Sequence, residues 1–341
     1  MKRLSACTLA LCAALSHQLQ AQRSELRLEK GWRFTRQDQA SFSTPDYNDS
    51  KWSRVTVPHD WAIYGPFSFE NDKQHLAIAQ DGQKEAMEHA GRTGGLPFVG
   101  AGWYRRSLDI PQDLGDRRVF LRFDGAMSHA RVYVNGKEVG YWPYGYNTFA
   151  FDITPYVRPG ASNTLAVRLE NKHESSRWYP GAGLYRNVHL TITSPTYIPL
   201  WGTRIQTPSV STDQAYVSVE TKVAGLSHLA GRPLRIETKI LSPEGKVVAE
   251  RSESFSSKGA DSIYRTGFDI SAPKLWDINQ PNLYKYAVTL SDDSRVIDRD
   301  TTTFGIRSIE LKAGEGFFLN GRKLKFQGAC LHHDLGPLGA A

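Results

Sequence analysis

The residues best suited to chemistry lie near the C-terminal end of the sequence, where His332, His333 and Asp334 follow an apolar stretch. Residues 324–331 have the character of a buried strand, and an α/β barrel presents its catalytic groups just past the ends of such strands. A metal site is less well supported, because in an extended segment only His332 and Asp334 share a face and zinc needs three or four ligands. A contact between His332 and a substrate is the better interpretation.

Two motifs nearer the N-terminus also place aromatic and charged side chains beside turn residues. Trp178 and Tyr179 precede Pro180 and two glycines in the sequence WYPGAGLYR, which predicts a tight loop with a rigid aromatic pair at its mouth. Flat aromatic faces suit sugar rings as well as they suit a protein core, so both roles are open for this pair. His59 and Asp60 could form a dyad, but adjacent residues of an extended chain point to opposite sides, which favours a structural turn.

From residue 26 onward, short β-rich runs alternate with turn residues, which predicts a mainly β protein. A first group of strands is expected at residues 102–109, 118–123, 130–134, 164–169 and 187–193. A second group, with the number and spacing typical of an immunoglobulin-like sandwich, is expected at 216–223, 234–241, 246–250, 264–270, 284–290 and 295–303. Asn-Gly pairs at 135–136 and 320–321 predict hairpins, because both residues accept the positive φ of a type I′ turn.

The stretch between Trp61 and Trp103 does not follow the strand pattern. Residues 80–89 favour a short helix, and residues 91–102 form a glycine-rich run. No strand leads directly into that run and no Gly-Lys-Ser/Thr follows it, so a long surface loop is favoured over a phosphate-binding loop. Long loops in compact domains are often functional, which makes this one a candidate to fold over a pocket.

Residues 1–21 have the features of a secretory signal peptide, since Lys2 and Arg3 precede a short apolar run and a plausible cleavage site. The run is too short to span a membrane, so a secreted or periplasmic protein without a membrane span is expected. Cleavage leaves Cys330 as the single cysteine, which excludes an internal disulfide. The net charge of +7 is spread over scattered basic residues, so nucleic-acid binding is not expected.

Seven segments, taken together and in order, resemble glycoside hydrolase family 2 and within it the bacterial β-galactosidases. They are VPHDW (57–61), GWYRR (102–106), FDGAMSHARVYVNGKEVG (123–140), FDIT (151–154), RWYPGAGLYRNV (177–188), FGIRSIE (304–310) and FFLNGRKLKFQGACLHHDLG (317–336). Each segment alone is a weak signal, whereas the ordered set is specific and covers nearly all of the chain after the signal peptide.

The resemblance implies a sugar-binding jelly-roll domain at residues 22–197, an immunoglobulin-like sandwich at 198–308 and the start of a (β/α)8 barrel at 309–341. It also implies a retaining mechanism, in which one glutamate protonates the leaving oxygen and another attacks the anomeric carbon. Both glutamates are expected beyond residue 341, so no catalytic residue is predicted in this chain and the chain alone is expected to be inactive.

The same resemblance implies which residues contact the substrate, a β-galactoside. His332 matches a histidine that touches the sugar, although Cys330 stands where many relatives have Asn. Residues 176–179 match a loop that reaches into the catalytic pocket, and Ser176 stands near the position of a sugar-binding Asp in some galactosidases. The predicted substrate-binding residues are therefore His332, Ser176, Trp178 and Tyr179. No cofactor or metal ligand is identified, and the ion requirement and oligomeric state stay open.

Two alternative functions are weighed against this one. The first is a stand-alone carbohydrate-binding module that uses Trp178 and Tyr179. The second keeps the family and changes the sugar to a glucuronide or a mannoside. We also expect the isolated chain to aggregate or to be cleaved from its C-terminus, because an unpaired apolar strand invites association.

Overall fold

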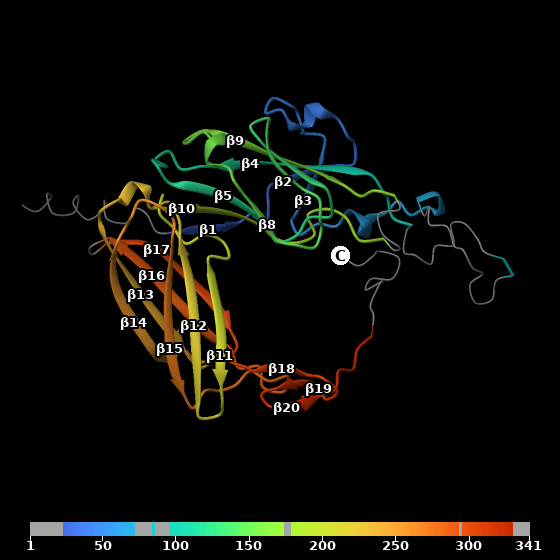
Figure 1. Cartoon of the computed structure of the whole chain (residues 1–341). Coiled ribbons are helices and arrows are strands. Elements are labelled where there is room, and N and C mark those ends of the chain that lie inside the picture. Colours follow the sequence, from blue (N-terminus) through green and yellow to red (C-terminus); the bar gives the residue numbers. More distant parts are fainter. Residues whose placement is uncertain (1–22, 72–83, 86–95, 174–178, 293–294, 330–341) are drawn as a thin grey trace, which may run out of the picture. The chain divides into compact units, whose positions relative to one another are not determined.

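The computed structural model describes residues 23–71, 84–85, 96–173, 179–292 and 295–329 (Figure 1). These residues belong to two compact units, Glu25–Ile192 and Thr193–Gln327, and the second unit also includes the residues before Glu25. Both units are built from strands, which confirms the expected mainly β class. The helices within the described ranges are all single 3-10 turns, at Ala40–Ser43 (η1), Trp61–Tyr64 (η2), Phe69–Asn71 (η3), Thr154–Tyr156 (η4) and Leu226–Leu229 (η5).

Three predicted features fall on residues outside the described ranges. They are the signal peptide at 1–21, nearly all of the helix expected at 80–89 and much of the glycine-rich run at 91–102. Among the helices that the structure does describe, none is long and apolar enough to cross a membrane.

The unit Glu25–Ile192 contains a four-stranded sheet in the order β1-β10-β5-β8 and a six-stranded sheet in the order β3-β2-β4-β9-β6-β7. The strands are β1 (Ser24–Arg27), β2 (Trp32–Thr35), β3 (Ser53–Val55), β4 (Ala101–Asp109), β5 (Arg118–Phe123), β6 (Ala130–Val134), β7 (Lys137–Trp142), β8 (Phe149–Asp152), β9 (Ser162–Glu170) and β10 (Val188–Thr193). Each strand predicted in this region is present, within two residues of its expected ends. The strands that sequence reasoning did not predict are the short β1, β2, β3, β7 and β8.

Alternation along the strands places one face of each sheet in a shared core. In β6, Val132 and Val134 are fully buried, whereas Arg131 and Tyr133 lie on the opposite face. Inward residues of both sheets, such as Leu121 of β5 and Val132, belong to one hydrophobic cluster. The sheets therefore pack face to face, and this packing fixes the register of each strand.

The segment between β2 and β3 covers part of the outer face of the six-stranded sheet. Phe42 packs edge-on against Trp52 and Trp103, with ring centroids 4.8 and 5.8 Å apart. Arg105 of β4 is 2% exposed and donates hydrogen bonds to Asp49 and to the carbonyl oxygen of Phe42. A buried guanidinium whose donors are used in this way fastens the segment to the sheet.

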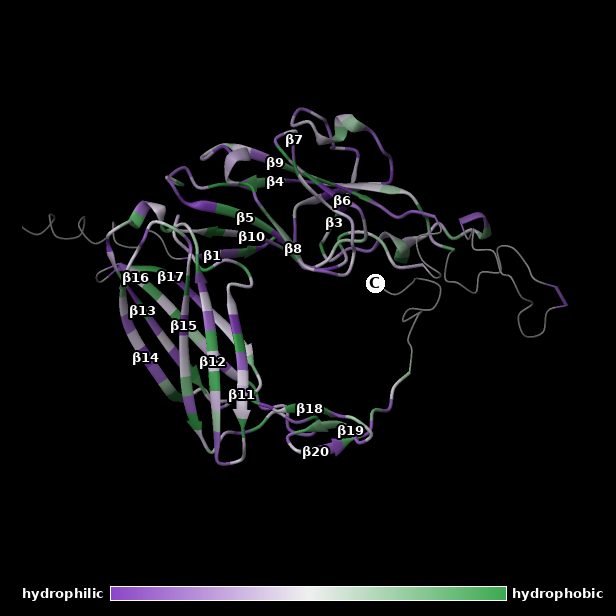
Figure 2. Ribbon diagram, in the orientation of Figure 1, coloured by the Kyte–Doolittle hydropathy of each residue, from purple (hydrophilic) through white to green (hydrophobic). Residues whose placement is uncertain are grey.

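The unit Thr193–Gln327 contains a three-stranded sheet in the order β11-β12-β15 and a four-stranded sheet in the order β14-β13-β16-β17. The strands are β11 (Thr203–Val210), β12 (Gln214–Val223), β13 (Pro233–Leu241), β14 (Val247–Ser256), β15 (Ser262–Ser271), β16 (Tyr284–Asp292) and β17 (Arg295–Phe304). Figure 2 shows the resulting bands of hydrophobic and hydrophilic residues along these strands. All six strands predicted here are present. Sequence reasoning missed β11, an edge strand interrupted at Pro208 by a register irregularity, where a missing N–H is tolerated.

A small sheet of three strands follows, formed by β18 (Ile309–Lys312), β19 (Gly316–Leu319) and β20 (Arg322–Leu324). The hairpin predicted at Asn320 and Gly321 is confirmed, with φ values of 50° and 73°. The strand predicted at 324–331 is wrong over residues 325–329, because β20 ends at Leu324 and these residues are irregular and exposed. No described residue pairs with them, and a barrel strand is stable only between neighbouring strands.

Candidate functional site

Most of the predicted substrate-binding residues lie outside the described residues. These are Ser176, Trp178 and His332, and their predicted contacts stay predictions. Tyr179 is described, at the point where the chain leaves that loop. The site can therefore be built from Tyr179 and from the residues that hold the two ends of the loop.

The motif that contains His59 and Asp60 forms a turn leading into η2. Asp60 caps this 3-10 helix, since its side-chain oxygen accepts a hydrogen bond of 2.8 Å from the amide of Ala62. The ring nitrogen Nδ1 of His59 instead shares a hydrogen bond of 2.7 Å with the hydroxyl of Tyr104. The two side chains have separate partners, so they form no acid–base dyad, and the structural turn predicted for this motif is confirmed.

The same turn holds the glycine-rich end of the loop. The Asp60 oxygen that caps η2 also accepts a bond of 3.2 Å from the amide of Ala182, and the amide of His59 donates to the carbonyl oxygen of Leu184 at 2.8 Å. Gly183 lies between these contacts with φ of 96°, and a Cβ there would overlap the carbonyl oxygen of His59. We call residues 58–62 and 179–184 together the loop bracket. Its geometry explains why glycine is required at this position.

Tyr179 is part of the core rather than of the surface. It is 3% exposed, and its hydroxyl donates a hydrogen bond of 3.0 Å to the carbonyl oxygen of Phe98. Asn171, just before the loop, donates to the carbonyl oxygen of Gly181 at 2.6 Å. These hydrogen bonds fix the two described ends of the loop, Asn171 and Tyr179, to neighbouring parts of the same unit. The predicted contact between Tyr179 and a sugar stays a prediction. In the structure this side chain anchors the end of the loop through its hydrogen bond to Phe98.

Burial changes the ionisation of the bracket. It raises the pKa of Asp60 to about 6, against hydrogen bonds from two backbone amides that favour the ionised form. Burial, aided by the charge of Arg36, lowers the pKa of His59 to about 4. Burial also raises the pKa of Tyr104 and Tyr179. At neutral pH the imidazole is therefore uncharged, and both phenols keep their protons.

A pocket of about 960 Å³ adjoins the bracket within the same unit, and His59, Asp60, Arg36 and Tyr64 are among the residues that line it. The ring of Tyr64 is 73% exposed and is stacked on His59, with centroids 5.7 Å apart. Arg36 donates to the carbonyl oxygen of Trp61 at 3.3 Å. An exposed aromatic ring and a guanidinium that line one pocket suit a polar ring-shaped ligand. The described residues of this pocket thus favour binding and contain no arrangement typical of a nucleophile and its base.

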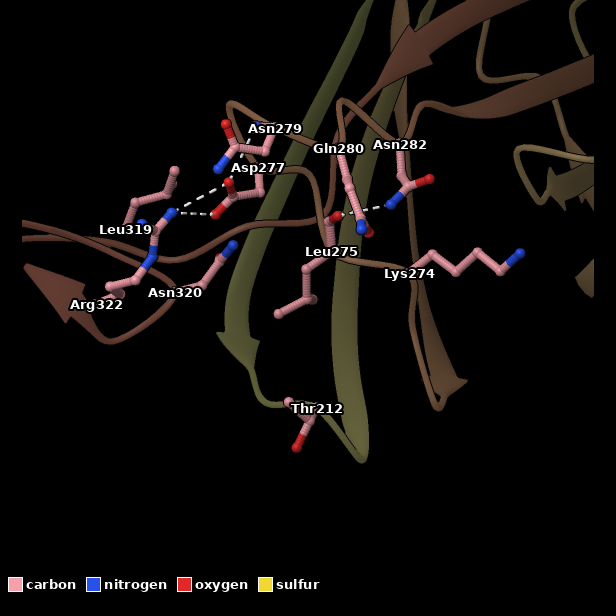
Figure 3. Close-up of a pocket in the computed structure, with 10 residues that line it drawn as sticks. All are labelled: Thr212, Lys274, Leu275, Asp277, Asn279, Gln280, Asn282, Leu319, Asn320 and Arg322. Atoms are coloured by element: carbon pink, nitrogen blue, oxygen red, sulfur yellow. Dashed lines mark hydrogen bonds and ion pairs between the residues drawn. The ribbon is translucent and has the colours of Figure 1, made fainter. Parts of the chain in front are cut away.

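A second pocket, of about 670 Å³, lies in the other unit, between the loop at residues 274–282 and the β18–β20 sheet (Figure 3). There Arg322 pairs with both carboxylate oxygens of Asp277, at 3.0 and 3.1 Å. Asn320 donates to the carbonyl oxygen of Trp276 at 3.0 Å. These contacts fasten the small sheet to the sandwich, so we assign this pocket a structural role.

Within the described residues, no group of three or more His, Cys, Asp or Glu side chains is placed to hold a metal ion. What sequence reasoning missed is the partnership between the two motifs, because Asp60 and Ala182 are 122 positions apart. The one available signal was that both motifs carry turn residues beside aromatic side chains.

Two units of antiparallel sheet, one of which holds a buried polar bracket, define a mainly β protein. Comparison with known proteins assigns its family. Residues 26–195 match the sugar binding domain of glycosyl hydrolases family 2, and residues 198–307 match a second domain of the same family. The chain belongs to glycoside hydrolase family 2.

Individual relatives agree with this assignment. The chain is 36% identical to the β-galactosidase BoGH2A of Bacteroides ovatus over 98% of its own length and 37% of that protein. It is 32% identical to a β-glucuronidase of Bacteroides fragilis, over 95% of the chain and 43% of that protein. The chain thus spans about two fifths of these relatives, at their N-terminal portion.

A solved structure of a family 2 member from Bacteroides cellulosilyticus has a TM-score of 0.82 and 32% identity, covering 91% of this chain and 39% of that one. A β-glucuronidase from Bacteroides uniformis has a TM-score of 0.75 and 27% identity, covering 93% and 36%. Both are similar in fold to the described units.

Proposed function

We propose that this chain is the N-terminal part of a secreted or periplasmic retaining glycoside hydrolase that cleaves β-galactosides. The observation that carries the proposal is the match to a β-galactosidase over 98% of the chain at 36% identity. In this proposal residues 22–197 are a jelly-roll domain, residues 198–308 an immunoglobulin-like domain and residues 309–341 the start of a (β/α)8 barrel.

The proposed task of the first domain is to deliver a sugar contact. Residues 174–178 lie between Asn171 and Tyr179, both of which are buried and hydrogen-bonded to the protein. The proposal assigns to these two described residues the role of holding the ends of the segment that carries Ser176 and Trp178, which are proposed to contact the sugar. His332 is proposed to touch the same sugar. The catalytic glutamates are proposed to lie on later barrel strands.

Side-by-side assays test this proposal. The full-length protein is expected to hydrolyse nitrophenyl β-galactoside, and residues 22–341 expressed alone are expected to be inactive. Activity of the isolated chain would overturn the placement of the glutamates. Tight binding of galactosides by the isolated chain, at micromolar concentration or better, would favour the carbohydrate-binding module instead.

A second candidate is a β-glucuronidase of the same family. It is favoured by the relative from Bacteroides fragilis and by a putative β-glucuronidase of Formosa agariphila that is 34% identical over 98% of the chain. A β-mannosidase is the third possible sugar specificity. Turnover of a panel of nitrophenyl galactoside, glucuronide and mannoside by the full-length protein separates the three.

A further inference from the structure

The outer face of the six-stranded sheet carries a pocket that the proposed function does not use. It has a volume of about 400 Å³ and shares no lining residue with the pocket beside the loop bracket. We call it the Tyr133 groove and define it by six of its lining residues: Asp38, Ser43, Trp103, Arg131, Tyr133 and Arg168. One side of the groove belongs to the segment between β2 and β3, and the other to strands β4, β9 and β6.

Strand register explains how these side chains meet. Trp103 of β4 is directly opposite Arg168 of β9, Arg168 is opposite Arg131 of β6, and Arg131 is opposite Tyr141 of β7. All four residues occupy outward positions, because their neighbours along each strand point into the core. The sheet thus displays a row in which aromatic rings stand at both ends and guanidinium groups between them.

The aromatic part of the groove is rigid. Tyr133 is stacked on Trp103, with ring centroids 5.6 Å apart and planes 23° from parallel. The indole nitrogen of Trp103 donates a hydrogen bond of 2.7 Å to Asp38. Trp103 is only 2% exposed, so it backs the ring of Tyr133, and the half-buried Tyr133 presents the fixed apolar surface at the groove. Side chains that are already immobile lose little entropy when a ligand binds.

The charged side chains in the polar part of the groove are paired with one another, two arginines with three carboxylates. Arg168 is hydrogen-bonded to Asp38 at 2.7 Å and to Glu170 at 2.9 Å, and Arg131 is paired with Glu138 at 2.9 Å. The bond from Arg168 lowers the pKa of Asp38, which keeps this carboxylate an ionised acceptor. A ligand with its own charge would have to displace one of these partners, whereas hydroxyl groups can add to them. The pairing of these groups, with one carboxylate in excess, therefore favours a neutral ligand rich in hydroxyls over an anionic one.

We propose that the Tyr133 groove binds a neutral sugar ring of an oligosaccharide. The inference goes beyond the proposed function, because it concerns a binding site that needs no turnover. An apolar ring surface next to fixed donors and acceptors matches a pyranose, which has an apolar face and hydroxyls at its edge. Neighbouring sugar units of a longer chain would extend along the row toward Tyr141.

Hydrogen exchange in the full-length protein tests the groove directly. The probe is a thio-linked β-galactotetraose, which a glycosidase cannot cleave, titrated while exchange is followed in peptides that contain residues 130–134 and 38–43. We expect both peptides to be protected at saturation. Failure of either peptide to gain protection, including the case in which the rest of the protein already covers it, would overturn the proposal.

A matched pair of variants locates the contact. Arg131→Ala removes an exposed arginine that pairs with a carboxylate, and Arg235→Ala removes a similar one from β13 of the other unit, where Arg235 pairs with Glu237 at 3.1 Å. We expect the probe concentration at half-protection to rise about fivefold in Arg131→Ala, as for the loss of one hydrogen-bonding group, and to stay unchanged in Arg235→Ala. Equal midpoints in both variants would refute the site.

An acidic oligosaccharide tests whether the groove prefers a neutral ligand. A galacturonic acid tetramer is expected to protect residues 130–134 less well than the neutral probe. Tighter binding of the acidic tetramer would overturn the assignment of a neutral ligand. Hydrolysis of nitrophenyl β-galactoside, measured separately, reports on the proposed function alone. Failure of the proposed sugar site in the groove therefore does not imply failure of the proposed function.

Discussion

Asp60 and His59 each make the stability of the loop bracket depend on pH, and mutation of one residue reveals the contribution of the other. Both side chains are 8% exposed. Burial raises the pKa of Asp60 from 3.8 to about 6, so between these values the folded state retains a proton that the unfolded state releases. At about 1.4 kcal/mol for each pKa unit, the contribution of Asp60 to stability falls by about 3 kcal/mol as the pH rises from 4 to 6.

His59 works in the opposite direction. Burial and the charge of Arg36 lower its pKa from 6.5 to about 4, so the unfolded state binds the proton first as the pH falls. The neutral imidazole therefore contributes about 3 kcal/mol to the free energy of unfolding. This contribution is fully present above pH 6.5 and is lost as the pH falls to 4. The two contributions oppose each other, and the wild-type bracket should have a nearly constant stability between pH 4 and 6.5.

Two conservative variants expose the separate slopes. Asp60→Asn keeps an acceptor oxygen for the amides of Ala62 and Ala182, and its stability should rise with pH by about 3 kcal/mol over the window. His59→Asn keeps an amide near the hydroxyl of Tyr104, and its stability should fall by a similar amount. The assay is urea unfolding followed by hydrogen exchange in the peptides of the bracket. Slopes that match the wild type in both variants would refute the buried, opposed ionisations.

Two further predictions concern stability. Gly183→Ala should destabilise its unit by more than about 2 kcal/mol, because the new Cβ would meet the carbonyl oxygen of His59 at a residue with positive φ. The control Gly231→Ala, at φ of 76° with open space around it, should cost about 1 kcal/mol. Thermal unfolding measures both variants, and equal costs would contradict the contact at Gly183. Asp298→Ala should lower the free energy of unfolding by about 3 kcal/mol, because the buried carboxylate pairs with Arg23 at 2.8 Å and accepts a hydrogen bond from the amide of Ile198 at 2.7 Å. A decrease below about 1 kcal/mol in urea unfolding would show that this ion pair is not needed for stability.

Local features were predictable from the sequence because they depend on a few neighbouring residues. The hairpins at Asn135 and Asn320 follow from the positive φ that Asn-Gly pairs accept, and the structure has φ of 52° and 50° there. Strand β6 was predicted with its correct ends, since its alternation of apolar and polar residues is strict. The turn at His59 followed from the geometry of adjacent residues.

The features that sequence reasoning missed depend on contacts between distant residues. Nothing near Asp60 indicates that its partner is the amide of Ala182, and nothing near Tyr179 decides between core and surface, because an aromatic ring suits both. The Tyr133 groove arises only when strands β4, β9 and β6 are in register and the segment between β2 and β3 lies beside them. The strand expected at 324–331 failed over 325–329 for the same reason, since a strand needs a neighbour that local sequence does not supply.

We propose above that this chain is the N-terminal part of a β-galactosidase, and the ratio of two kcat/KM values tests this proposal most directly. For the full-length protein, kcat/KM on nitrophenyl β-galactoside should exceed that on nitrophenyl β-glucuronide by at least about a hundredfold, because a pocket that binds a neutral hydroxymethyl group leaves a carboxylate poorly paired. A ratio below one would contradict the claim and identify the enzyme as a glucuronidase.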